Sequence, residues 1–358
     1  MPTHLASLDS LVHPHQMEIQ EFASYALVID ARSAVAYQED HLPGAVSVPM
    51  AAGPPSTLRE PPAMGAAAPG TDETGPSMPS ALAAHTQRLS AGEAVLLYCD
   101  RGGLDSMVWA APLRAVGFRV DVLGGGWINY RRWVSAGLEL LPRVLSFRPL
   151  VAPPVSGLCR VLDVLVRQGE QVLDLAAMAG QHLVPGLTLQ GDDPPSQAAF
   201  ETALLDAMRR LNPQRPVWIR DGMADLGGLA LPPALRDALR RSKGVTLEVP
   251  LHVRASAWFE RLQAMNTPMS VLLQAFSASS APPISQTLEQ WRSLANAGQI
   301  TDALAAIIKG YIDPRCAGVP PSAKVEVIHL ASLKADAVGA AVNGWLGLSS
   351  SAVPNGTN

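Results

Sequence analysis

The chain has 358 residues and a formal net charge of −4, with 27 Lys and Arg residues against 31 Asp and Glu residues. This length accommodates two domains with full cores. The charge balance argues against a protein built mainly to grip nucleic-acid backbones. The three cysteines, Cys99, Cys159 and Cys316, are widely spaced and form no Cys/His cluster, so neither a disulfide framework nor a metal site is predicted.

The location expected from the sequence is the cytoplasm. No apolar run approaches the ~20 residues that a membrane span requires, and no leader-like segment with an apolar core opens the chain. A reducing compartment also agrees with the odd number of separated cysteines. We therefore expect a cytoplasmic protein that does not interact with a membrane. The sequence makes no prediction of the oligomeric state.

Residues 1–140 are predicted to form a parallel α/β domain, because short apolar strands alternate with helical segments. The first buried strand covers 26–30 and ends in Asp30-Ala31-Arg32. An acid and an arginine two residues apart after such a strand predict an internal ion pair that supports the fold. Residues 51–80 are rich in Ala, Pro, Gly and Ser, a composition typical of a flexible insertion.

A cysteine follows the next buried strand, predicted at 94–98, and is the candidate catalytic nucleophile. Ligands of open α/β sheets bind at the C-terminal ends of strands. Backbone N–H groups in a glycine-bearing loop, followed by a helix N-terminus, favour an anion there. The candidate site is therefore a Cys99 thiolate that carries sulfur or selenium; the alternative is a cysteine buried only for packing. Its active-site loop consists of Asp100, Arg101, Gly102, Gly103, Leu104, Asp105 and Ser106.

Four motifs in the first domain occur in the order expected of a rhodanese domain. They are Asp30-Ala31-Arg32, His41-Leu42-Pro43-Gly44-Ala45, Tyr98-Cys99-Asp100-Arg101-Gly102-Gly103 and Gly124-Gly125-Gly126-Trp127. Among rhodaneses, the pattern Cys-x-Arg-Gly-Gly-x-x-Ser and the stretch 125–132 resemble the bacterial tRNA 2-selenouridine synthases.

Members of that family replace the sulfur of wobble 2-thiouridine in tRNA by selenium. The resemblance implies that Cys99 is the sulfur- or selenium-carrying nucleophile. It also implies a tRNA partner and a sulfur or selenium donor. No bound cofactor is implied; selenophosphate, and geranyl diphosphate for a geranylated intermediate, would be co-substrates.

Residues 141–316 are predicted to form a second α/β domain that resembles a P-loop kinase fold, and the family resemblance extends over about residues 15–316. The family's phosphate loop falls on 152–159, where Ser156 and Gly157 alone match. A phosphate loop needs glycines that expose backbone N–H groups, a Lys, and a Ser or Thr for Mg²⁺. Two prolines remove two N–H groups, and Leu158 brings no charge. The sequence therefore predicts a degenerate loop that does not bind phosphate.

Residues 317–358 are predicted to form a partly disordered C-terminal tail with one helix-like stretch at 335–346. Two functions stay open. The first is a tRNA 2-selenouridine synthase-like transferase. The second is a divergent paralogue, either a rhodanese-type sulfurtransferase alone or a non-catalytic binding protein. The intact Cys99 motif favours the first function, and the degenerate phosphate loop favours the second.

Overall fold

The computed structural model describes residues 11–12, 21–49, 80–100, 106–180, 194–221, 226, 228–279, 281–316 and 326–350. The chain divides into two compact units, Met1–Gly137 and Leu138–Asn358. The division falls inside helix α5 (Gly126–Val144), near the boundary that the sequence analysis places after residue 140. Among the described helices, none is both long and apolar enough to cross a bilayer.

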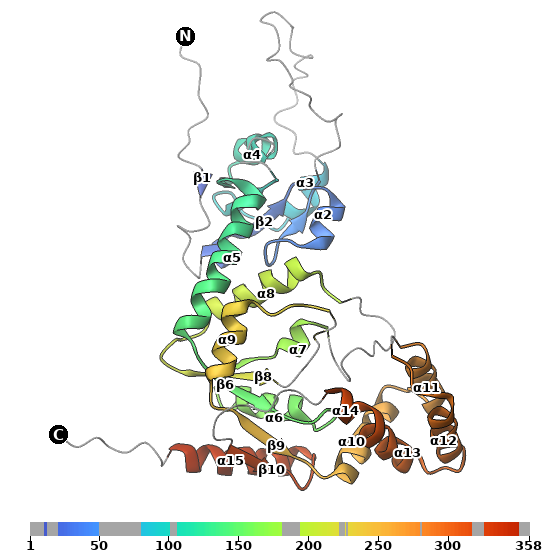
Figure 1. The fold of residues 1–358 in the computed structure, drawn as a ribbon. Helices are drawn as coiled ribbons and strands as arrows, with labels where there is room; N and C mark the ends of the chain where they lie inside the picture. Colours follow the sequence, from blue (N-terminus) through green and yellow to red (C-terminus); the bar gives the residue numbers. More distant parts are fainter. Residues whose placement is uncertain are drawn as a thin grey trace, which may run out of the picture. The chain divides into compact units, whose positions relative to one another are not determined.

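The first unit is built on a five-stranded sheet in which all paired strands are parallel. Figure 1 labels two of these strands, β1 and β2, and the helices α2 to α5. The strand order is β1-β5-β4-β2-β3. The strands are β1 (Leu11–Val12), β2 (Leu27–Asp30), β3 (Val46–Ser47), β4 (Ala94–Tyr98) and β5 (Arg119–Leu123). The helices are α1 (Glu21–Ser24), α2 (Ala34–Glu39), α3 (Ser80–Thr86), α4 (Ser106–Ala115) and the first part of α5. This is the parallel α/β domain that the alternation of elements predicts.

Strand β4 occupies the centre of this sheet, and its apolar sequence explains why. Val95, Leu96 and Leu97 are completely buried, as expected for a strand covered on both faces. From β2 the chain continues to β3 on one side of β4, whereas from β4 it continues to β5 on the other side. The winding direction reverses here, so the C-terminal end of β4 lies at the position where α/β sheets bind ligands.

The second unit contains another five-stranded parallel sheet, in the order β10-β9-β6-β8-β7. Its first strand, β6, lies in the centre and is followed by a loop and a helix. The strands are β6 (Ser146–Val151), β7 (Gln171–Leu173), β8 (Pro216–Asp221), β9 (Val245–Glu248) and β10 (Glu326–His329). The helices that accompany this sheet are α6 (Leu158–Arg167), α7 (Leu175–Met178), α8 (Gln197–Arg209), α9 (Pro233–Arg241) and α15 (Ala335–Ser350).

A block of helices is inserted between β9 and β10 and has a core of its own. It contains α10 (Leu251–Ala264), α11 (Met269–Ser277), α12 (Ser285–Asn296), α13 (Ile300–Ile307), a π-helical turn (Ile308–Ile312) and α14 (Asp313–Cys316). The core is aromatic: Phe276, Trp291 and Tyr311 make edge contacts with ring centroids 5.1–6.0 Å apart. These aromatic side chains therefore serve packing.

The expectation of a separate C-terminal tail is wrong for residues 326–350. This segment supplies strand β10, which pairs with β9, and helix α15, which packs against α6. The predicted helix at 335–346 is present and extends to Ser350. Val338 and Val342, four residues apart, lie on one face of α15 and are completely buried in the unit's core. The predicted insertion at 51–80 lies outside the described residues except for Ser80, where α3 begins.

Two neighbouring residues of β10 test whether this segment belongs to the core. Ile328 is 5% exposed and Val327 is 39% exposed. We predict that Ile328→Ala lowers the free energy of unfolding of the second unit by about 2–5 kcal/mol, because it leaves a cavity. Val327→Ala should cost under about 1 kcal/mol. Urea unfolding of both variants measures this difference, and equal small losses would mean that residues 326–350 are a dispensable tail.

Candidate active site

Cys99 follows β4 directly, at the end of the strand that the sequence analysis assigned to it. Its side chain lies in a buried position, with the residue 2% exposed. Its carbonyl oxygen accepts a hydrogen bond from the backbone N–H of Trp127, over 2.8 Å. Trp127 belongs to the Gly124-Gly125-Gly126-Trp127 motif, in which Gly125 and Gly126 adopt positive φ angles of 75° and 58°. The motif after β5 therefore holds the backbone of the candidate nucleophile.

The predicted active-site loop is only partly described. Asp100 is exposed, and residues 101–105, which include Arg101, Gly102, Gly103, Leu104 and Asp105, lie outside the described residues. Ser106 begins α4 and is completely buried. Within the described part of the chain its Oγ has no hydrogen-bond partner. A buried hydroxyl at the start of a ten-residue helix leaves a polar atom available at the end of this loop.

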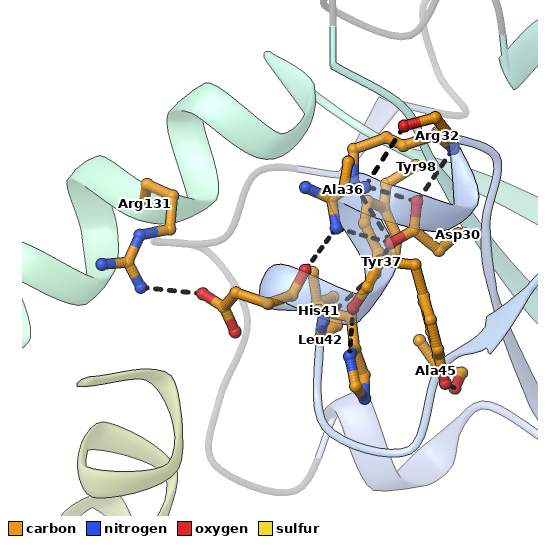
Figure 2. Close-up of polar contacts among 11 residues, drawn as sticks. Asp30, Arg32, Ala36, Tyr37, His41, Leu42, Ala45, Tyr98 and Arg131 are labelled. Atoms are coloured by element: carbon orange, nitrogen blue, oxygen red, sulfur yellow. Dashed lines mark hydrogen bonds and ion pairs between the residues drawn. The ribbon is translucent and has the colours of Figure 1, made fainter. Parts of the chain in front are cut away.

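Asp30 and Arg32 form the ion pair that the sequence predicts, and Figure 2 shows it. The Arg32 Nη2 atom lies 2.6 Å from Asp30 Oδ2, and Nε donates to both carboxylate oxygens at 3.0 and 3.1 Å. The backbone N–H of Arg32 donates to Oδ1 as well, over 2.9 Å. Both side chains are at most 2% exposed. This fork geometry satisfies most of the polar atoms of two charges that are otherwise costly to bury.

Tyr98, the residue before Cys99, completes the surroundings of Asp30. Its hydroxyl donates to Asp30 Oδ2 over 2.6 Å and accepts from the backbone N–H of Leu42 over 3.1 Å. Burial, together with the negative charge and hydrogen bond of Asp30, raises the pKa of Tyr98 far above its ordinary value. Burial alone would lower the pKa of Arg32, but the hydrogen bond and charge of Asp30 raise it overall. Tyr98 therefore stays a donor and Arg32 stays charged.

The same arginine also anchors the segment that follows α2. Arg32 Nη2 donates to the carbonyl of Asp40 over 2.5 Å, and the carboxylate of Asp40 pairs with Arg131 of α5 at 3.1 Å. His41 lies next in the chain, stacks on Tyr37 with ring centroids 4.0 Å apart, and donates from Nδ1 to the Tyr37 carbonyl. Figure 2 shows this side chain directed at the end of α2. The observed contacts of His41 therefore stabilise the turn after α2.

The guanidinium of Arg32 also lies over an aromatic face. Its central carbon is 3.8 Å from the ring centroid of Trp127 and 5.5 Å from that of Tyr98. Trp127 in turn stacks with Tyr98 at 5.9 Å and with Tyr130 at 5.3 Å. A cation held this close to an indole face fixes the ring as well as the charge. The Gly-Gly-Gly-Trp motif is visible in the sequence, but nothing in it places the Trp127 ring beside Arg32.

The loop at 152–157, where the sequence predicts a degenerate phosphate loop, is packed against side chains of its own unit. Ser156 is 2% exposed, and its Oγ has no hydrogen-bond partner among the described residues. Gly157 has a φ of 71°, and a Cβ atom added to it would lie 2.8 Å from Cδ2 of Leu333. Leu158, at the family's lysine position, is 6% exposed and belongs to the same core cluster as Leu333. The apolar core therefore occupies space beside this loop.

The loop also presents the wrong polarity for an anion. The carbonyl of Pro154 accepts hydrogen bonds from Nε and Nη2 of Arg254, at 3.0 and 2.6 Å. Arg254 is buried and pairs with Asp313 at 2.5 and 3.0 Å. A phosphate loop directs N–H groups at its ligand, whereas this loop directs a carbonyl oxygen at a guanidinium. Among the described residues there is also no cluster of acidic, His or Cys side chains that would hold a metal ion.

Comparison with known proteins identifies the class of the first unit. Residues 16–132 match the family model of the rhodanese-like domain, so the first unit contains a rhodanese-like domain. The chain is further related to proteins named tRNA 2-selenouridine synthase, as its motifs predict.

The relative from Nitrosomonas europaea is 26% identical over 54% of this chain and 50% of its own length. Those from Alcanivorax borkumensis and Marinobacter nauticus are 28% and 31% identical, over 46% and 44% of this chain and 44% and 42% of theirs. The chain thus spans about half the length of the curated relatives it matches. A solved structure, the BH2092 protein from Bacillus halodurans, is 25% identical with a TM-score of 0.24, covering 35% of this chain and 74% of that one.

The raised pKa of Tyr98 leads to a test in alkali. Tyr98→Phe removes a donor to Asp30 and an acceptor for Leu42, and should lower the free energy of unfolding by about 1–3 kcal/mol at pH 7 to 9. The tyrosine is protonated in both states below its unfolded pKa of about 10. Above that pH the unfolded state alone loses the proton, so the wild type loses stability that the variant does not.

The gap between wild type and Tyr98→Phe should therefore shrink above about pH 10. Urea unfolding at a series of pH values measures it. Tyr37→Phe is the control for removing a tyrosine hydroxyl elsewhere in the same unit. That hydroxyl donates to the Ala45 carbonyl. A gap that stays constant or widens above pH 10 would contradict the raised pKa.

The polarity of the second unit's loop leads to a binding test. Leu158→Lys restores the family's charge, but the Pro154 carbonyl, Arg254 and Leu333 still surround the loop. We predict no measurable heat of pyrophosphate binding, with or without Mg²⁺, for either wild type or variant. The variant should also be less stable, because its ammonium replaces a core side chain. Saturable pyrophosphate binding by calorimetry would show that the loop still accepts phosphate.

Proposed function

We propose that this protein is a rhodanese-type transferase that takes up sulfur or selenium on Cys99 and delivers it in tRNA modification. The proposal is supported by the rhodanese-like domain at residues 16–132 and by relatives named tRNA 2-selenouridine synthase. The most specific form of the proposed reaction is the replacement of sulfur by selenium in the wobble 2-thiouridine of tRNA. The cysteine is the part of the family machinery that this chain retains.

One observation carries the proposal: Cys99 lies at the winding reversal of a parallel sheet, with its backbone held on both sides. The Trp127 N–H holds its carbonyl, and Tyr98 is fixed by Asp30 immediately before it. The two residues that hold the Cys99 backbone, Tyr98 and Trp127, are themselves tied to the buried Asp30–Arg32 ion pair. A fixed strand end followed by a helix N-terminus is suited to hold a negatively charged chalcogen.

The loading step is written for thiosulfate, a simple sulfur donor. The Cys99 thiolate attacks the outer sulfur of thiosulfate, and a new S–S bond forms at Cys99. The S–S bond of thiosulfate breaks with its electron pair on the departing sulfite. The product is a Cys99 persulfide anion, with no external oxidant or reductant needed.

A second candidate is favoured by the geometry of the second unit. The loop at 152–157 offers a carbonyl to Arg254 and holds Leu333 against Gly157, two features that favour a protein without a selenophosphate or geranyl diphosphate site at this loop. The protein would then be a rhodanese-type sulfurtransferase that passes its sulfur to an acceptor other than 2-thiouridine. Both candidates require Cys99 to be loaded; they differ in whether tRNA is changed afterwards.

The experiment follows Cys99 and tRNA in sequence. Peptide mass spectrometry after incubation with thiosulfate should show one added sulfur atom on the Cys99 peptide. Cys99→Ser should abolish loading, because a hydroxyl does not form a persulfide. Cys159→Ser, which removes an exposed thiol in the second unit, should load as the wild type does.

The tRNA stage then separates the two candidates. Selenophosphate and a tRNA that contains 2-thiouridine are added, and the tRNA nucleosides are measured. Selenium in the nucleoside supports the family reaction. Loading of Cys99 with unchanged tRNA supports the sulfurtransferase. If Cys99 gains no sulfur, or if Cys99→Ser transfers as well as the wild type, the proposal fails.

A further inference from the structure

We propose that Arg32 and Trp127 are positioning residues for Cys99, acting through a closed ring of contacts rather than as structural support alone. The inference rests on the proposed function, since it concerns how the Cys99 sulfur is held for transfer. The proposal assigns a role to the aromatic face of Trp127 and to the Arg32 guanidinium, which donates to both carboxylate oxygens of Asp30.

The ring of contacts has five members, and each link is a short interaction. The Tyr98 hydroxyl donates to Asp30 over 2.6 Å, and Asp30 pairs with Arg32 at 2.6 Å. The guanidinium of Arg32 lies 3.8 Å from the Trp127 ring centroid. The backbone N–H of Trp127 donates to the Cys99 carbonyl over 2.8 Å, and the peptide bond from Cys99 back to Tyr98 closes the ring.

The ring spans segments that are distant in sequence but meet at one end of the sheet. Asp30 is the last residue of β2 and Tyr98 the last residue of β4, Arg32 and Cys99 come just after these strands, and Trp127 lies in the first turn of α5. The register places Asp30 directly beside Tyr98 across the two parallel strands. A further backbone bond, from the Ala31 N–H to the Tyr98 carbonyl at 2.9 Å, ties the β2 and β4 ends together. Displacing one member therefore shifts the others.

The shape of the Arg32 side chain indicates that it positions its neighbours in addition to supplying a positive charge. A lysine would neutralise the Asp30 carboxylate equally well. Only a planar guanidinium donates to both carboxylate oxygens, reaches the Asp40 carbonyl and presents a flat face to an indole at once. The contact with the Trp127 ring therefore requires an arginine at position 32. The same contact holds Trp127 in place, and with it the backbone N–H that donates to the Cys99 carbonyl.

The Trp127 ring can be changed without removing the hydrogen bond to Cys99, because that bond comes from the backbone. Trp127→Phe keeps an aromatic face for Arg32, and Trp127→Leu removes it. Trp133→Leu is the matched control: Trp133 lies on the same helix, and its ring contacts Phe22 and Tyr130. Arg32→Lys keeps the charge but loses the fork and the flat face.

The test measures steady-state sulfur transfer from thiosulfate by the full chain and determines kcat and KM separately. In Trp127→Leu, kcat should fall at least ~10-fold while KM stays within about twofold, because the sulfur is misplaced and the donor's binding groups are untouched. Trp127→Phe should recover kcat to within about threefold of wild type, and Arg32→Lys should behave like Trp127→Leu. If Trp133→Leu lowers kcat as much as Trp127→Leu, or if Trp127→Phe does not recover it, the positioning role is overturned.

A second readout does not depend on sulfur transfer. Cys99 is buried, so its alkylation by neutral iodoacetamide reports local opening at the end of β4. The rate at the Cys99 peptide should rise at least ~5-fold in Trp127→Leu and stay near wild type in Trp133→Leu and Trp127→Phe. The alkylation result stays informative even if the wild type transfers no sulfur. That outcome would reject the proposed function but not the positioning role. Equal alkylation rates in Trp127→Leu and Trp133→Leu would reject the positioning role alone.

Discussion

The buried ion pair between Asp30 and Arg32 is the interaction on which the organisation of the first unit depends. Two buried charges are tolerated because they pair with each other and with polar neighbours. Tyr98, the Asp40 carbonyl and the Trp127 ring all face this pair. By satisfying it, these groups are drawn to one end of the sheet, where Cys99 lies. The contacts that satisfy the ion pair thus also fix Tyr98 before Cys99 and Trp127, whose backbone N–H binds the Cys99 carbonyl.

The two units illustrate opposite uses of a strand–loop–helix element. In the first unit, β4 ends in a cysteine whose backbone is held while its loop leads to a helix N-terminus. In the second unit, β6 ends in a loop whose carbonyl is held by Arg254 and whose glycine faces Leu333. Arg254 and Leu333 come from segments more than ninety residues away in sequence. The loop has been incorporated into the core of the unit, which explains why proline and leucine are accommodated where a phosphate site would need glycine and lysine.

Much of this could be predicted from sequence because the signals are local. The apolar strands before Asp30 and Cys99 and the Asp-x-Arg pattern predict the sheet, the strand end and the ion pair. The stack of Arg32 on Trp127 was not predicted, since residues 95 positions apart meet only through the strand order. Arg254 was missed because a lone arginine on a helix gives no local signal. Strand β10 was missed because it is four residues long and buries only Ile328, too little to show an alternating pattern.

The central claim is that the Cys99 thiol carries a transferable sulfur atom, and the direct measurement is release of that sulfur by cyanide. After incubation with thiosulfate and removal of free donor, cyanide attacks the outer sulfur of a persulfide, giving thiocyanate and returning the thiolate. The account predicts one thiocyanate per wild-type chain and none from Cys99→Ser. Wild-type protein that releases no thiocyanate, or Cys99→Ser that releases as much as wild type, would contradict it.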